Sequence, residues 1–81
     1  MPAIKVIHRK LGKERADGLA FTEHNEIHLD TRLKGKKYFE IAIHELLHIQ
    51  FPDMSEEDVL KHSKKLTNEL WKLGFRKVET K

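Results

Sequence analysis

The segment from Lys36 to Gln50 constrains the fold of this chain more than any other part of the sequence. Its apolar residues recur at steps of three and four, the spacing of one face of an α-helix: Phe39, Ile43, Leu46 and Leu47. Gly35 precedes the segment and Pro52 follows it, so the pattern predicts a helix over residues 36–50. His44 and His48 lie four residues apart beside the apolar stripe, which places both imidazoles on one face of that helix.

The two histidines belong to the pentapeptide His44-Glu45-Leu46-Leu47-His48. Two imidazoles one helical turn apart can bind the same zinc ion. Glu45 follows the first histidine, where its carboxylate can act as general base on a water that the metal activates. The motif specifies only three residues, and the chain has 6 histidines, so the motif could occur by chance. Whether it is a metal site must therefore be judged from the residues around it.

The absence of cysteine narrows the choice of metal ligands. It excludes disulfides, thiolate zinc sites and cysteine nucleophiles, and leaves histidine and carboxylate side chains as zinc ligands. With 81 residues, the chain is expected to form one small domain near the lower size limit for a single core. It shows neither a signal peptide nor a membrane span, so we expect a cytoplasmic protein without a membrane partner.

Residues 1–32 have strand character. The segment from Ile4 to His8 alternates moderately, and residues 19–22 and 26–30 form two further short runs of strand type. We therefore predict an α+β fold in which a short antiparallel β-meander precedes two helices, all within a single domain over residues 1–81.

The second helix is predicted over residues 55–73. Ser55 is a good N-cap residue, and Gly74 is typical of the position just after a helix C-terminus. The residues expected to face the core are Val59, Ser63, Leu66, Leu70 and Leu73. The acidic first turn of this helix complements the helix dipole, which by itself could explain its composition.

That first turn also offers candidates for a third metal ligand. A hydrolytic zinc site usually has three protein ligands and keeps a fourth position for water. Relative to Val59, Glu56 lies about 60° away on the packed side of the helix, whereas Glu57 lies about 160° away. His62 lies about 60° from Val59 in the other direction. Glu56 is therefore the preferred ligand, with Glu57 and His62 as alternatives.

The order of these features resembles the zincin-type metallopeptidases. The residues that carry the resemblance are Gly18, the strand Glu26-Ile27-His28-Leu29-Asp30, Leu33, Gly35 and then Ile41-Ala42-Ile43-His44-Glu45-Leu46-Leu47-His48. The succession is similar to the minimal catalytic core of SprT-like and ImmA/IrrE-like proteins and to small metallopeptidases of phages and bacteria. Phe51 and Met54 stand where a metzincin would have its glycine and third histidine, which excludes that class.

The resemblance implies a zinc-dependent peptidase acting on a peptide or protein substrate. His44, His48 and a downstream carboxylate such as Glu56 would hold Zn²⁺, and Glu45 would deprotonate the water that attacks the peptide carbonyl. The strand over residues 26–30 could offer its free edge to an extended peptide.

A binding module is the alternative to an enzyme. Such a module would use the zincin scaffold, with a structural or vestigial metal site, to bind a host protein or nucleic acid. The net charge of +3 motivates the nucleic-acid version, although lysine spread along a chain usually indicates a solvated surface and no nucleic-acid motif accompanies it. In a structural site, His62 would join His44, His48 and a carboxylate to fill all four coordination positions.

Overall fold

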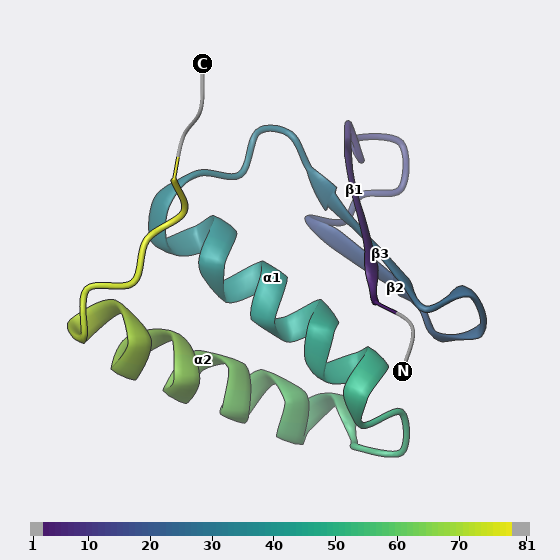
Figure 1. Ribbon diagram of the computed structural model, residues 1–81. Coiled ribbons are helices and arrows are strands. Elements are labelled where there is room, and N and C mark those ends of the chain that lie inside the picture. The colour runs from purple at the N-terminus through teal and green to yellow at the C-terminus, as the bar shows by residue number, and fades with distance from the viewer. Residues whose placement is uncertain (1–2, 79–81) are drawn as a thin grey trace.

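The computed structural model describes residues 3–78, which form three layers: a small sheet, helix α1 on one face of the sheet, and helix α2 on the far side of α1 (Figure 1). In chain order the elements are β1 (Lys5–Arg9), β2 (Gly18–Phe21), a 3₁₀ turn (Thr22–His24), β3 (Glu26–Asp30), α1 (Gly35–Gln50) and α2 (Glu56–Lys72). The predicted α+β class and both predicted helices are confirmed.

The sheet has the strand order β1-β3-β2. β2 pairs with β3 in antiparallel orientation, with Gly18 opposite Leu29. β1 pairs with β3 in parallel orientation, with Lys5 opposite Glu26. The predicted antiparallel meander is therefore wrong for β1, because the chain crosses from one edge of the sheet to the other before β3 enters between the two outer strands.

The crossing loop, residues 10–17, is held by a buried carboxylate at the end of β3. Asp30 is only 1% exposed, and one of its oxygens accepts a hydrogen bond from the backbone N–H of Leu11 at 3.0 Å. The backbone N–H and the guanidinium of Arg32 donate to the same carboxylate at 2.8–2.9 Å. These hydrogen bonds hold the pKa of Asp30 well below its usual range, and the bond from the Arg32 guanidinium has the largest effect. The loop is thereby tied to β3, and no pattern within β1 reveals this pairing.

Helix α2 begins and ends as its sequence predicts. The Oγ of Ser55 accepts a hydrogen bond from the backbone N–H of Asp58 at 3.1 Å, as an N-cap residue does. Gly74 follows the helix with a φ of +97°, a left-handed conformation that glycine adopts without strain.

The buried face of α2 is shifted from the predicted one. Val59, Ser63 and Thr67 are fully buried, whereas Leu66 and Leu73 are 44% and 73% exposed. The three buried residues are small and spaced four apart, so they let α2 approach α1 closely along one line. The larger leucines are consequently turned away from the contact, which corrects the predicted core stripe.

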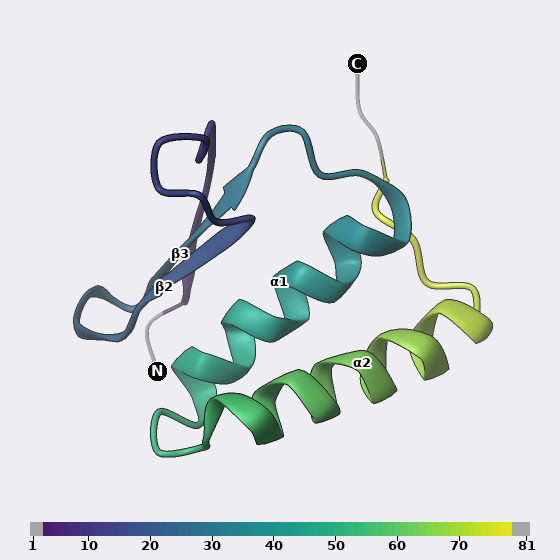
Figure 2. The ribbon, with the colours of Figure 1, turned by 180° about the vertical axis from the view of Figure 1, so that it is seen from behind.

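A short corner joins the two helices. The backbone N–H of Phe51 bonds to the carbonyl of Leu47 at 2.8 Å, and that of Met54 bonds to the carbonyl of Phe51 at 2.9 Å. The corner sends α2 back along α1 and sets Glu56 beside the last turn of α1. Figures 1 and 2 both show this corner at the same end of the molecule as the 3₁₀ turn between β2 and β3. Within residues 3–78, no helix is long and apolar enough to cross a membrane.

Candidate metal centre

Three potential ligands converge at the corner between α1 and α2. The Nε2 atom of His44 lies 2.9 Å from one carboxylate oxygen of Glu56, and the Nε2 atom of His48 lies 2.9 Å from the other. The two Nε2 atoms are 3.3 Å apart. Zinc bonds of 2.0–2.2 Å in a tetrahedral site separate neighbouring ligand atoms by about 3.4 Å. The three side chains are thus placed close to the spacing of a single metal site.

The fold explains how each ligand reaches its place. His44 and His48 are partly buried, because they project from adjacent turns of the helix that packs on the sheet. Glu56 is the first residue of α2 and reaches the imidazoles from an exposed position. The Ser55 cap fixes where the first turn of α2 begins, and it thereby fixes the position of the Glu56 backbone from which the carboxylate extends.

The two alternative ligands lie elsewhere. Glu57 is exposed, and His62 lines a separate apolar groove with Leu47, Phe51 and other residues of the two helices. Among residues 3–78, the group of His, Asp and Glu side chains that could hold a metal ion consists of His44, His48 and Glu56. Two imidazoles and one carboxylate leave one position of a tetrahedral site without a protein ligand.

Glu45 is the one buried residue of α1, at 8% exposure, and it lines the same pocket as the three ligands. Burial, followed by the negative charge of Glu56, raises the pKa of Glu45 from an ordinary 4.5 to about 7. Its carboxylate has no hydrogen-bond partner among the described residues. A divalent cation on His44, His48 and Glu56 would place a positive charge beside this carboxylate and favour its ionised form.

The pocket has a volume of about 430 Å³ and opens to solvent. Its lining comes from β2, the 3₁₀ turn, α1 and the helix corner: Gly18, Leu19, Ala20, Thr22, His44, Glu45, His48, Pro52 and Glu56. β2 is an edge strand that pairs only with β3 in the described sheet, so its other edge is free beside the pocket. The prediction of a free edge at residues 26–30 is wrong, because β3 is paired on both sides.

Gly18 permits the close contact between β2 and α1. A Cβ atom at this position would lie 2.8 Å from the Cγ2 of Ile41 and 2.9 Å from the Cγ of Glu45. Glycine is therefore needed for the approach of the two elements, and it leaves the space that the Glu45 side chain occupies. Asp17-Gly18 is a dipeptide typical of turns, but the close approach of Gly18 to α1 is seen only in the structure.

Replacing Gly18 by alanine is expected to destabilise the protein. Overpacking a close contact costs about 1–3 kcal/mol, which lowers the melting temperature of a domain of this size by roughly 5–15 °C. Gly12→Ala is the matched control, because the nearest atom to a Cβ there is 4.0 Å away. Thermal unfolding followed by circular dichroism compares the two variants, and equal melting temperatures would show that the contact at Gly18 is not tight.

Comparisons of the chain with protein-family models, with curated proteins and with solved structures gave no significant match. The chemistry of the centre must therefore be inferred from its donor atoms, its geometry and its pocket.

Proposed function

We propose that the protein is a zinc-dependent peptidase. One observation carries the proposal: His44, His48 and Glu56 converge on one point, beside the buried, unpartnered carboxylate of Glu45, in a single open pocket. A hydrolytic metal centre combines ligands that hold the metal with a carboxylate that acts as general base. Here the three ligands and Glu45 provide both parts in one pocket.

The donor atoms favour zinc. Two imidazole nitrogens and one carboxylate, with a fourth position open to solvent, form a set typical of catalytic zinc sites. Oxygen-rich sites for calcium or magnesium would need more carboxylates than this group provides. When bound, zinc would supply Lewis-acid polarisation of a water molecule and of the peptide carbonyl.

The remaining steps belong to residues of the chain. Glu45 would take the proton of the attacking water and deliver it to the nitrogen of the leaving amine. Glu45 lines the same open pocket as the three ligands, so a water in that pocket can reach its carboxylate. The free edge of β2 would hold an extended peptide by main-chain hydrogen bonds, with the scissile carbonyl above His44 and His48.

The position of His62 argues against a structural zinc site, in which the protein would supply all four ligands. A closed zinc site needs a fourth protein ligand, but His62 lines the separate groove and does not belong to the ligand group. The open fourth position supports a hydrolytic role over a structural one.

Removal of the metal provides the test. Treatment with a chelator should abolish cleavage of a mixed peptide library, and addition of one equivalent of Zn²⁺ should restore it. Cleavage products identified by mass spectrometry before chelation, after chelation and after zinc addition give the comparison. Activity that persists in the metal-free protein would rule the mechanism out.

A further inference from the structure

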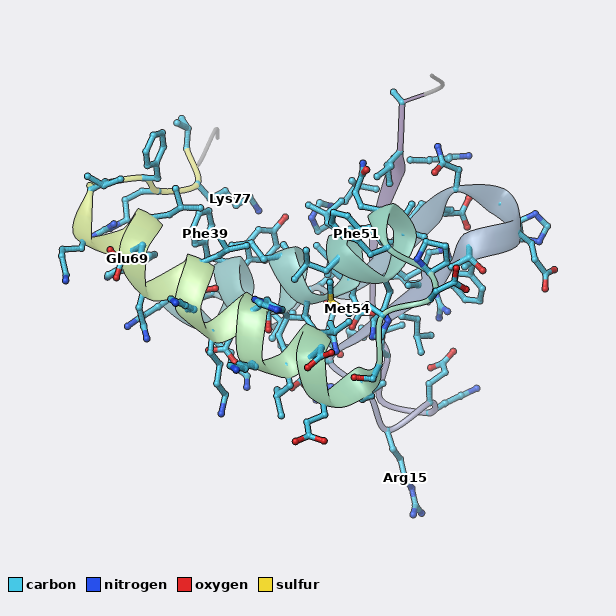
Figure 3. All side chains as sticks on the ribbon, turned by 90° about the horizontal axis from the view of Figure 1, so that it is seen from below. Arg15, Phe39, Phe51, Met54, Glu69 and Lys77 are labelled. Atoms are coloured by element: carbon cyan, nitrogen blue, oxygen red, sulfur yellow. The ribbon has the colours of Figure 1, made fainter. Side chains whose placement is uncertain are left out.

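A second, mainly apolar groove lies between α1 and α2 and is separate from the pocket of the metal centre. Its volume is about 350 Å³, and its apolar lining consists of Leu47, Phe51, Met54 and Leu66. Phe51 is 53% exposed and Leu66 is 44% exposed, so the described part of the chain leaves the groove open. Phe51 and Met54 lie toward one end of the two helices and the lining residue Glu69 lies toward the other (Figure 3). We call this feature the interhelix groove.

Helix α2 carries a second exposed leucine on the groove side. Leu73, its C-cap residue, lies about 20° around the helix from Leu66 and about two turns further along. Both leucines belong to the stripe that the sequence predicts for the core, but the fully buried residues that face α1 are Val59, Ser63 and Thr67. Leu66 and Leu73 therefore form an apolar line without a partner on the outermost helix of the fold (Figure 1).

The interhelix groove is also lined by one cation and one carboxylate. Lys65 and Glu69 lie one helical turn apart, and neither forms an ion pair with another residue of the segment 3–78. Along the helix axis, the two residues lie about 3 Å on either side of Thr67. If a twofold axis passes at the level of Thr67, an antiparallel copy of α2 places its Glu69 opposite Lys65 and its Lys65 opposite Glu69. The charges of the groove are thus complementary to themselves.

The same twofold axis also matches the apolar residues. It brings the Leu66 side chains of the two copies together at the centre, because each lies about 1.5 Å from the level of the axis. Leu73 of each copy then lies about level with the groove residue His62 of the other. A parallel arrangement would instead place Lys65 opposite Lys65 and Glu69 opposite Glu69, so like charges oppose it.

We propose that the interhelix groove is the contact surface of a homodimer, in which the α2 helices of two copies pack antiparallel around a twofold axis. The groove of each copy covers Leu66 and Leu73 of the other, and two symmetric ion pairs between Lys65 and Glu69 set the direction. Lys61 and Lys72 lie about 80–100° around the helix from His62, at the edge of this face, where solvent screens their charges. The proposal is independent of the peptidase function.

Sedimentation velocity of the full chain tests the proposal. One helix face makes a small interface, so we expect a dissociation constant on the order of 10 µM. The sedimentation coefficient should rise from that of one chain to that of two between about 1 µM and 1 mM protein. A chelator is present, because His62 could otherwise join two copies through a bound ion. A single chain at every concentration would overturn the proposal and show that the groove has another occupant.

Two exposed leucines of α2 provide a matched pair of variants. Leu66 and Leu60 are 44% and 45% exposed, but Leu60 lies about 120° around the helix from Leu66 and does not line the groove. Leu66→Ser should weaken self-association about tenfold or more, since the twofold axis removes the side chain from both sides of the contact. Leu60→Ser should leave it unchanged. Circular dichroism verifies that both variants are folded, and equal effects of the two changes would contradict the proposal.

Charge reversal tests the antiparallel direction. Lys65→Glu and Glu69→Lys should each weaken self-association about fivefold or more, because like charges then face each other twice. An equimolar mixture of the two variants should associate as the parent protein does, since each copy supplies the charge that the other lacks. Lys64→Glu, which makes the same change of charge outside the groove, should have no effect. If the mixture does not associate, or if Lys64→Glu and Lys65→Glu behave alike, the copies meet through another surface and the proposal is wrong.

Discussion

Glu45→Gln is expected to retain zinc and to lose peptide cleavage by a factor of about 10²–10⁴, the range that general acid–base catalysis contributes. Glutamine fills nearly the same volume, so the ligands His44, His48 and Glu56 should keep their positions. It cannot accept the proton of the attacking water. The variant also removes a buried carboxylate without a hydrogen-bond partner, so the metal-free protein should become more thermally stable.

Glu40→Gln is the control for this experiment, because Glu40 lies on the same helix but does not line the pocket. It should leave both zinc content and kcat/KM close to those of the parent protein. Zinc content by elemental analysis, kcat/KM for one library-derived peptide and the melting temperature are measured for all three proteins. Cleavage by Glu45→Gln at the parental rate would remove Glu45 from the mechanism.

Glu56→Ala is expected to weaken zinc binding by at least about 100-fold, since changes to groups that only support the ligands already cost 10–100-fold. The variant removes the carboxylate that lies 2.9 Å from the Nε2 atoms of both His44 and His48. Two imidazoles alone hold zinc weakly, and the lost charge also leaves the cation less compensated. Titration of the metal-free protein with Zn²⁺, followed by calorimetry, measures the affinity.

Glu57→Ala and His62→Ala are matched controls for the ligand assignment. Glu57 is the next residue of the same exposed first turn, and His62 lies about 1.4 turns further along α2. Both variants should bind zinc with the parental affinity. Loss of zinc in His62→Ala together with retention in Glu56→Ala would reverse the assignment and favour a different arrangement of the corner.

The parts of the fold that depend on neighbouring residues could be predicted from the sequence. The period of apolar residues gives α1, and the cap at Ser55 with the glycine at position 74 gives both ends of α2. The helical-wheel angle of Glu56 also favoured it as the residue nearest the two histidines. The helical-wheel angle identifies the correct residue because a short corner packs α2 directly against α1. A residue on the packed side of the first turn of α2 therefore lies beside the histidines of α1.

The parts that depend on distant residues could not be predicted. The parallel pairing of β1 depends on a loop that crosses the sheet and bonds to Asp30. The free edge beside the pocket is that of β2, because β3 enters the centre of the sheet. In α2 the hydrophobicity of Leu66 points to the core, but the contact with α1 selects the smaller Thr67. Each case is decided by packing between elements, and the pattern within one element contains no information about it.

We propose that His44, His48 and Glu56 hold one zinc ion and leave one coordination position open for hydrolysis. The most direct measurement is a crystal structure of the zinc-loaded protein with anomalous diffraction data at the zinc edge. We expect a single anomalous peak about 2.0–2.2 Å from both Nε2 atoms and from a Glu56 oxygen, with a water as the fourth ligand facing the pocket. A peak at another place, or a fourth ligand from the protein, would show that this is not a hydrolytic zinc site.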